Sequence, residues 1–281
     1  MEREIKDYCI RFTLLVSRIM KSQGVPVLLY HRVIKEPLNS PVYAVSLPIF
    51  EKQMKYLSAE GYRTVSCLDL IRYVNGEITL PDKSFVITFD DGFQDNYDAI
   101  KIARQFGFNP VLFIATGFIG CEYDYLPFLG DCCKSNFSKR KAVKGKVSFL
   151  TGQQLRELKK MGVEIFPHTV NHRKLTAIGY EQQREEIEDS QKILHDLLGI
   201  DSRFFCYPYG EYNNDSISIL SGLNYYGAFA VRDGLNQKGD TPFALKRHDV
   251  TGFSRSHFRL LLTEQFAWYH KMGKLYRSIK I

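Results

Sequence analysis

Short hydrophobic runs recur along the chain and alternate with segments of helical periodicity. Continuous apolar runs that are rich in β-branched and aromatic residues are typical of buried strands. Seven runs predict strands, at residues 25–30, 85–89, 111–115, 163–166, 204–207, 226–231 and 244–247. Helical patterns lie between most of them, at 47–59, 96–106, 151–161, 181–198 and 213–221. Strands that alternate with helices predict an α/β fold, either a β/α barrel or a doubly wound sheet.

Both ends of the chain show amphipathic patterns with basic residues. Residues 1–24 predict an N-terminal amphipathic helix, and residues 256–281 predict a C-terminal basic one, with no acidic residue after Glu264. Either helix could pack on the outside of the domain or contact an anionic membrane surface. Residues 1–24 contain no uninterrupted apolar segment and no cleavage pattern, so they predict neither a signal peptide nor a membrane span. We therefore expect a cytoplasmic protein, or one peripheral at the inner face of the membrane.

Composition narrows the range of partners. A chain of 281 residues with 44% hydrophobic content can form a single core, and its net charge of +7 permits an anionic partner. Because there is no Cys/His finger and no long basic run, no nucleic-acid partner is expected, and the basic residues at 139–146 are interpreted as a solvated loop. The six cysteines show no CxxC spacing and are expected to be reduced thiols.

Residues 117–150 form the longest irregular stretch and are predicted to be a substrate loop.

Two polar motifs point to a hydrolytic metal site. TFDDG (88–92) ends one predicted strand, and HTVNH (168–172) follows another. Zinc in a catalytic site takes about three protein ligands and leaves one position for water, and Asp91, His168 and His172 would supply that set. The i, i+4 spacing of His168 and His172 is expected to place the two imidazoles on one side of a helical turn. Asp90 then remains available as a general base.

The expected cofactor is a divalent metal ion. Zinc suits two imidazoles and a carboxylate best, and Co, Ni, Mn or Fe can use the same ligands. Such an ion lowers the pKa of its bound water to around 7 and polarises a carbonyl group. The motifs therefore predict metal-assisted hydrolysis.

A third motif completes a resemblance to a known family. YPYG (207–210) follows the predicted strand at 204–207. With TFDDG and HTVNH, it resembles the motifs of the NodB-type polysaccharide deacetylases, carbohydrate esterase family four, over residues 25–255. The resemblance implies a single domain with a distorted (β/α)7-type barrel. It also implies that Tyr207, Pro208, Tyr209 and Gly210 form a wall of the substrate groove, and that the backbone N–H of Tyr209 faces the oxyanion.

The chain departs from the family pattern at two places. Family members often have an arginine just before the third motif that orients the base, whereas this chain has Phe205-Cys206, and Arg203 lies too far upstream. Arg247, at the end of the last predicted strand, is the proposed replacement, although a surface ion pair would also explain it. In addition, Phe166-Pro167 replaces the small residues that usually precede the first histidine, which would narrow one side of the site.

Two histidines are candidates for the general acid that protonates the leaving amine. His31 ends the first predicted strand, and LYHRV (29–33) resembles the circularly permuted branch of the family that includes exopolysaccharide N-acetylglucosamine deacetylases. His248 occupies the late position that is usual in the unpermuted branch. We favour His31 because its strand-end position and its context both match the permuted branch. The other histidine would be a buried structural residue.

The predicted activity is removal of N-acetyl groups from an amino sugar by a metal-dependent hydrolase. The expected substrate is an N-acetylated polysaccharide, oligosaccharide or lipid-linked glycan precursor. The same site would also serve a deformylase or another amide hydrolase that acts on a lipid-linked sugar. A sugar-binding member of the fold that lacks turnover is the alternative from a different class. The intact Asp90, Asp91, His168 and His172 set argues against that alternative.

Overall fold

The computed structural model describes residues 24–35, 43–123, 146–251 and 255–266. The predicted N-terminal helix (1–24), most of the loop at 117–150 and the end of the predicted C-terminal helix therefore lie outside the described residues. None of the helices in the described part of the chain is long and apolar enough to cross a bilayer.

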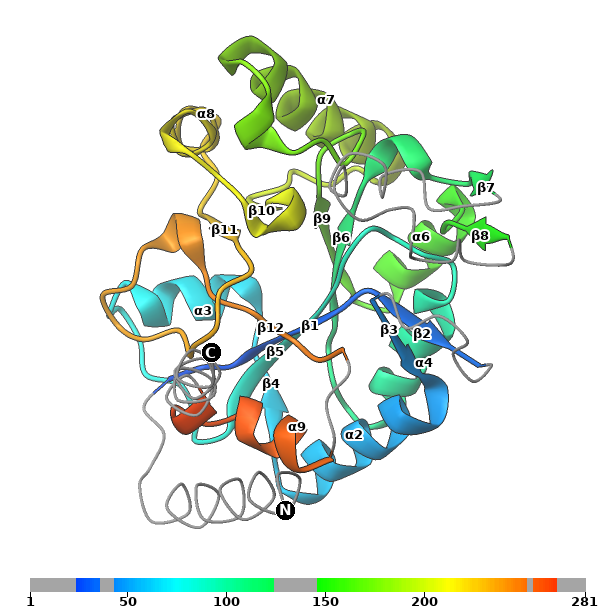
Figure 1. Ribbon diagram of the computed structural model, residues 1–281, viewed down its shortest axis with the longest axis vertical. Coiled ribbons are helices and arrows are strands. Elements are labelled where there is room, and N and C mark those ends of the chain that lie inside the picture. Colours follow the sequence, from blue (N-terminus) through cyan, green and yellow to red (C-terminus); the bar gives the residue numbers. More distant parts are fainter. Residues whose placement is uncertain (1–23, 36–42, 124–145, 252–254, 267–281) are drawn as a thin grey trace, which may run out of the picture.

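Parallel strands form a distorted, incomplete barrel at the centre of the molecule (Figure 1). The main sheet has the order β12-β1-β5-β6-β9, with β4 also paired to β5, and β10 pairs with β11. An isolated parallel bridge between Phe229 and Leu245 joins β11 to the segment before β12. The strand bounds are β1 (Val27–Tyr30), β4 (Arg63–Thr64), β5 (Ser84–Phe89), β6 (Val111–Ile114), β9 (Glu164–Pro167), β10 (Phe204–Cys206), β11 (Gly227–Phe229) and β12 (His248–Asp249).

Helices surround these strands (Figure 1). They are α2 (Leu47–Ala59), α3 (Cys67–Val74), α4 (Asn96–Gln105), α6 (Gly152–Lys160), α7 (Tyr180–Leu198), α8 (Asn214–Gly222) and α9 (Arg255–Leu261). Local signals in the sequence explain several of their ends. Thr151 and Asn213 form capping boxes at the starts of α6 and α8, and Gly199 ends α7 in the left-handed conformation.

Shorter elements connect the strands and helices. Beside β1 lies the two-stranded sheet of β2 (Arg32–Ile34) and β3 (Ala44–Ser46). An antiparallel pair, β7 (Glu122–Tyr123) and β8 (Val147–Ser148), flanks the predicted substrate loop. The 3₁₀ helices are η1 (Thr116–Phe118), η3 (Leu175–Ala177), η4 (Pro208–Gly210) and η5 (Pro242–Ala244).

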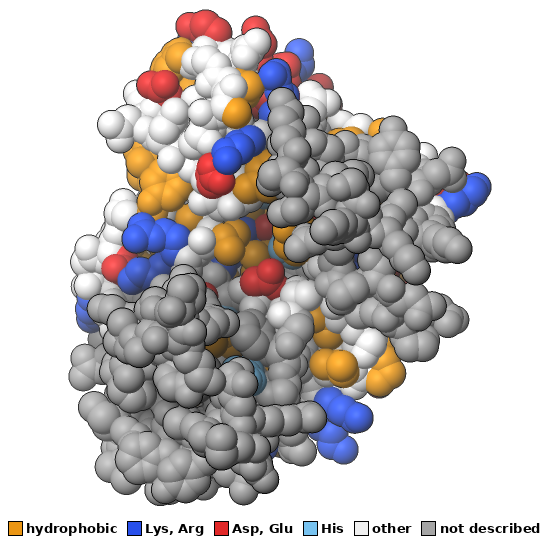
Figure 2. Space-filling view, viewed as in Figure 1, with side chains coloured by type: hydrophobic (Ala, Val, Ile, Leu, Met, Phe, Trp, Pro, Cys, Tyr) orange, Lys and Arg blue, Asp and Glu red, His pale blue; other side chains and the backbone are white. Residues whose placement is uncertain are grey.

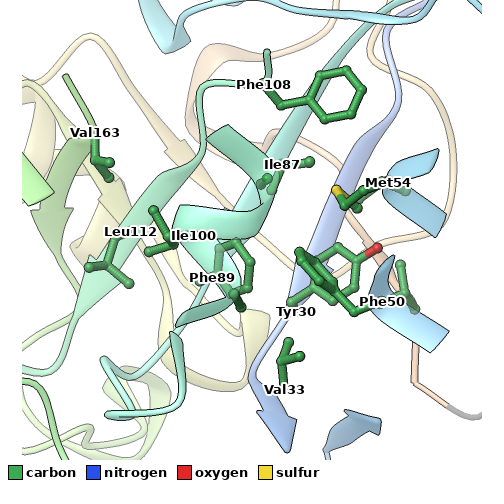
Figure 3. Packing of buried hydrophobic residues seen from close by; sticks show 14 of the residues in the cluster. Tyr30, Val33, Phe50, Met54, Ile87, Phe89, Ile100, Phe108, Leu112 and Val163 are labelled. Atoms are coloured by element: carbon green, nitrogen blue, oxygen red, sulfur yellow. The ribbon is translucent and has the colours of Figure 1, made fainter. Parts of the chain in front are cut away.

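The larger part of the core lies between the strands and the outer helices. Figure 3 shows Tyr30, Phe50, Met54 and Phe89 turned toward one another. The Tyr30 ring stacks on Phe89 at 5.4 Å and meets Phe50 edge-on at 5.1 Å. Its hydroxyl donates a hydrogen bond to Gln53, so the buried phenol is satisfied. This layer fixes the carboxyl ends of β1 and β5, where the polar motifs begin.

Helix α3 packs against the opposite face of the same strands. Successive side chains of a strand point to opposite faces, so Val27, Val86 and Val111 face away from the outer core. They share a cluster with Leu70 and Ile71 of α3. Val27 and Val111 are the first residues of β1 and β6, and Val86 lies in the first half of β5. Because α3 packs with these three valines, it covers the amino ends of the strands. The candidate site lies at the carboxyl ends.

The partly buried carboxylate of Glu164 gives a test of this packing. Glu164 Oε2 accepts a hydrogen bond from the Cys67 N–H at the start of α3, at 3.1 Å. Burial raises the pKa of Glu164; the Cys67 N–H opposes this effect and the charge of Asp69 adds to it. Because the pKa is higher in the folded state, the stability contribution of Glu164 is greatest at low pH and is lost as the pH rises through the raised pKa.

We therefore expect Glu164→Gln to increase stability at neutral pH by about 1–3 °C in Tm. The difference from wild type should disappear below about pH 4.3, where a glutamate is protonated in both states. Thermal unfolding as a function of pH measures this, with the exposed Glu77→Gln as the matched control. A Glu164→Gln variant that is less stable than wild type at neutral pH would contradict the assignment.

Most predicted elements match the structure, and the last predicted strand is misplaced. Residues 242–244 form η5, and the strand begins at His248 instead of within 244–247. The Asn236 side chain explains the shift. Its amide donates to the Lys246 carbonyl at 2.9 Å, and its oxygen accepts from the Lys246 N–H at 2.8 Å. Both backbone groups of Lys246 are thus paired with a side chain, so the strand resumes only after Arg247.

Candidate metal and catalytic site

Two adjacent aspartates end β5 and are almost completely buried. The Asp90 N–H donates to the Tyr30 carbonyl, which continues the pairing of β5 with β1. The chain then turns through positive φ angles at Asp91 (72°) and Gly92 (83°). A Cβ at Gly92 would lie 2.8 Å from Ile114 Cδ1, so glycine permits this tight turn. The turn places both carboxylates at the carboxyl end of the barrel.

His168 and His172 face Asp91 from the end of β9. His168 Nε2 lies 3.6 Å from Asp91 Oδ1, and His172 Nε2 lies 3.2 Å from the same oxygen. His168 Nδ1 is 2.7 Å from the carbonyl oxygen of Cys206. That contact orients the ring and leaves Nε2 toward the site, as is usual for metal-binding histidines. Burial lowers the pKa of His168 to about 4, so the imidazole is neutral.

The prediction of a helical turn between the two histidines is wrong. Residues 168–172 form an irregular loop in which Thr169 and His172 have φ angles of 65° and 53°. These positive φ angles are incompatible with a right-handed helix. The ring centroids of His168 and His172 nevertheless lie 4.9 Å apart. The loop, not a helix, therefore brings the imidazoles together.

Asp91, His168 and His172 fit a divalent metal ion. Their donor atoms lie within 4.8 Å of one another, and all three residues are buried. Among the described residues, no hydrogen-bond donor with acceptable geometry reaches Asp91 Oδ1, although it is inaccessible to solvent. A buried carboxylate oxygen between two imidazole nitrogens is a donor set that zinc uses. The site can therefore hold zinc or a similar ion.

Asp90, His168 and Cys206 also lie within ligand distance of one another. Burial raises the pKa of the Cys206 thiol well above its ordinary value, so the sulfur is protonated and is a poor metal ligand. Asp90 is moreover paired with an arginine. Asp91, rather than Asp90, is the carboxylate that remains available to a metal.

A fully buried arginine holds Asp90. Arg247 Nη1 and Nη2 lie 2.7 and 2.8 Å from the two oxygens of Asp90 in a bidentate pair. Arg247 also donates to the Ala230 carbonyl and to the Thr88 hydroxyl. Burial alone would raise the pKa of Asp90, but Arg247 and His168 outweigh it and hold that pKa well below its usual range. Asp90 is therefore a carboxylate.

Cys206 stands where the family pattern often has an arginine. Arg247 Nη2 lies 2.9 Å from Cys206 Sγ, so the guanidinium reaches Asp90 directly beside the thiol. Arg247 thus contacts Asp90 from the segment before β12, beside the short side chain of Cys206.

The two candidate histidines lie in different surroundings. His31 directly follows β1. Burial is the largest influence on the pKa of Asp90 and of Asp91 and raises both values, and His31 is among the groups that lower them. His248 is fully buried, with Phe266 edge-on at 4.9 Å and its Nδ1 3.6 Å from Asp233. Of the two histidines, His31 is thus the one whose electrostatic influence reaches both aspartates.

The third motif lies against the histidine loop. The Tyr209 ring meets His172 edge-on at 4.7 Å, and Tyr209 has a φ angle of 61°. Tyr207 is buried, and its hydroxyl donates to the Phe243 carbonyl. A Cβ at Gly210 would lie 2.3 Å from the Val231 nitrogen, so only glycine fits there. On the face shown in Figure 2, histidine and acidic side chains are visible near the centre among hydrophobic ones.

Comparisons with known proteins agree with this site. The sequence profile described as polysaccharide deacetylase matches residues 77–228, more than half of the chain. The chain belongs to the polysaccharide deacetylase family. It is therefore a hydrolase that acts on an amide bond, and its NodB-type barrel is the fold expected from the motifs.

Several relatives of this deacetylase align over most of its length. YxkH of Bacillus subtilis (strain 168) is 26% identical over 240 residues, which cover 85% of this chain and 76% of that protein. The poly-β-1,6-N-acetyl-D-glucosamine N-deacetylase of Escherichia coli (strain K12) is also 26% identical; the match covers 80% of this chain but only 36% of that protein. The chain thus spans about a third of that relative's length.

Solved structures share the fold of the deacetylase. IcaB from Ammonifex degensii has a TM-score of 0.69 and 25% identity, over 89% of this chain and 98% of that one. The Streptococcus pyogenes deacetylase PplD, in complex with acetate, has a TM-score of 0.69 and 24% identity, over 86% and 99% of the two chains.

The structure adds residues of the deacetylase that the motifs did not reveal. Asp95 accepts hydrogen bonds from Arg32 Nε at 2.9 Å and from the Val33 N–H at 3.0 Å. Asn96 donates to the His31 carbonyl at 2.6 Å. These two residues begin α4 and fix the backbone at the His31 carbonyl and at Val33, two residues further on. Their position just after TFDDG is the one signal in the sequence that could have suggested them.

Proposed function

We propose that this deacetylase is a metal-dependent enzyme that removes N-acetyl groups from an amino sugar in a polysaccharide, an oligosaccharide or a lipid-linked glycan precursor. The observation that carries the proposal is the convergence of Asp91, His168 and His172 beside Asp90, which is itself held by Arg247. The names of the Escherichia coli and Staphylococcus aureus relatives, both poly-β-1,6-N-acetyl-D-glucosamine N-deacetylases, support an N-acetylglucosamine polymer as the substrate class.

Asp91, His168 and His172 would hold the metal, with zinc as the first choice. Such an ion supplies Lewis acidity to the acetyl carbonyl and to water. Asp90, which Arg247 keeps ionised and oriented, takes the proton from the attacking water. The Tyr209 N–H donates to the oxyanion as the carbonyl becomes tetrahedral. Tyr207, Pro208, Tyr209 and Gly210 form the groove wall beside the acetyl group.

His31 donates a proton to the departing amine in this proposal. The carbon–nitrogen bond then breaks, and acetate and a free amino sugar are released. The contacts of Asp95 and Asn96 support this role, because they hold the backbone next to His31 in place. The burial of His248 against Phe266 supports a packing role for that residue.

The test combines elemental analysis with acetate release. Purified protein is expected to contain about one divalent ion per chain and to release acetate from β-1,6-linked N-acetylglucosamine oligosaccharides. Chelation should remove both the ion and the activity, because the ligands alone cannot acidify water. Added zinc should restore both.

Acetate release that persists after complete loss of metal would contradict the proposal. A parallel assay with a lipid-linked N-acetylated sugar compares the two substrate forms. Faster turnover of the soluble oligosaccharide would count against a lipid-linked substrate and leave the deacetylase assignment in place.

A further inference from the structure

The loop that carries both histidines has a backbone conformation that it cannot hold by itself. Thr169 is β-branched and has a φ angle of 65°, and His172 has a φ angle of 53°. Such residues rarely adopt positive φ angles, and they do so where surrounding structure imposes them. Something must therefore fix residues 168–172 from outside the loop.

One side of the loop is fixed by η1. The Thr116 N–H donates to the Thr169 carbonyl at 3.0 Å, and the Gly117 N–H donates to the Val170 carbonyl at 2.9 Å. A Cβ at Gly117 would lie 2.8 Å from that same carbonyl oxygen. These contacts satisfy two carbonyl groups of the loop, and the His168 N–H donates to the Ile114 carbonyl at 2.8 Å, but the N–H groups of Val170 and Asn171 bond to another partner.

The carboxylate of Glu186 is that partner. Glu186 lies on the buried face of α7 and is 6% exposed. Its Oε2 accepts hydrogen bonds from the Val170 N–H and the Asn171 N–H, both at 2.9 Å. Its Oε1 accepts a third bond from Asn171 Nδ2, also at 2.9 Å. All three donors belong to the two residues midway between His168 and His172.

We propose that Glu186 is a positioning residue for the metal ligands. Its carboxylate holds the centre of the loop against α7 while η1 holds the other side, so both Nε2 atoms face Asp91. The inference rests on the proposed metal site, and it concerns the affinity and geometry of that site. Glu186 lies outside all three sequence motifs, and its hydrogen bonds to the loop come from Val170 and Asn171.

The experiment compares Glu186→Ala with Glu185→Ala. Glu185 is the preceding residue of α7 and is exposed, so it controls for loss of one charge from the same helix. Metal-free proteins are titrated with zinc in competition with a chromophoric chelator. We expect Glu186→Ala to bind zinc about 10-fold or more weakly than wild type, by analogy with outer-shell partners of metal sites, and Glu185→Ala to match wild type.

Two further readouts separate positioning from general stability. The visible absorption spectrum of the Co(II)-loaded protein reports ligand geometry and should change only in the Glu186 variants. Glu186→Gln should recover most of the zinc affinity, because its amide oxygen can accept both backbone N–H groups and its NH₂ can donate to a flipped Asn171 amide. If Glu186→Ala does not fold, Glu186→Asp takes its place, since its shorter carboxylate cannot keep all three bonds.

The outcomes distinguish this inference from the proposed function. Wild-type protein that binds no divalent ion would overturn the proposed metal site itself. Wild-type protein that binds zinc, with a Glu186→Ala variant of equal affinity and an unchanged Co(II) spectrum, would overturn the role of Glu186 alone. A drop in Tm without a change in affinity or spectrum would likewise leave Glu186 as an ordinary packing residue.

Discussion

Replacing Asp90 with asparagine is expected to lower the rate of acetate release by about 10²–10⁴-fold, the range typical of general acid–base catalysis. An amide cannot accept the proton of the attacking water. It can still accept a hydrogen bond from Arg247, but it leaves that buried guanidinium without its counter-charge, so the variant should also be less stable than wild type. Single-turnover acetate release measures the effect, and elemental analysis should show that the Asp90→Asn variant keeps its metal.

Asp98→Asn, which changes a partly exposed aspartate, is a suitable control for Asp90→Asn. Asp98 is the same residue type, lies in the first turn of α4 and pairs with Lys35 at the surface. We expect it to leave acetate release unchanged. An Asp90→Asn variant that works as fast as wild type would exclude Asp90 as the base.

Replacing Arg247 with methionine is expected to cost about 3–5 kcal/mol of stability, because it leaves the buried Asp90 carboxylate without its counter-charge. It should also slow acetate release, since Asp90 loses the bidentate contact that orients it. Chemical denaturation measures the first effect, and the deacetylation assay measures the second. Methionine retains much of the side-chain volume, so the cost arises mainly from the lost charge pair.

A matched control and a double variant sharpen the Arg247 experiment. Arg72 forms an exposed ion pair with Glu77, and Arg72→Met should cost at most about 1 kcal/mol. If the Asp90–Arg247 pair dominates, the double variant Asp90→Asn, Arg247→Met should be less destabilised than the sum of the two single changes. A strictly additive result would show that Arg247 stabilises the barrel through other contacts.

Hydrophobic periodicity predicted the helices and most strands of this chain because their patterns are local. Residues 47–59 form α2 with the predicted bounds, and the strand at 85–89 differs from β5 by a single residue. Helix α3 was not predicted: it has only eight residues, and its position depends on packing against strands far away in sequence. The shift of β12 likewise depends on a distant side chain, that of Asn236.

The motifs predicted which residues gather at the site, but not how they are held. The predicted candidates Asp90, Asp91 and His31 follow the carboxyl ends of β5 and β1, where a parallel barrel brings side chains together, whereas Arg247 reaches Asp90 from the segment just before β12. The loop conformation at 168–172 could not be deduced from i, i+4 spacing. It depends on Glu186, which accepts hydrogen bonds from Val170 and Asn171, 16 and 15 positions earlier in the chain. Glu186 belongs to no recognisable sequence motif.

The Asp90–Arg247 pair has a consequence for the order in which the protein is made. Its two members are 157 residues apart in sequence, so Asp90 leaves the ribosome long before its counter-charge. Until the segment before β12 has been synthesised and docked, the interior around Asp90 cannot close over an ionised carboxylate without a large electrostatic cost. Completion of the barrel and burial of the ionised base are thus coupled late events, and a nascent chain that ends before Arg247 should be inactive.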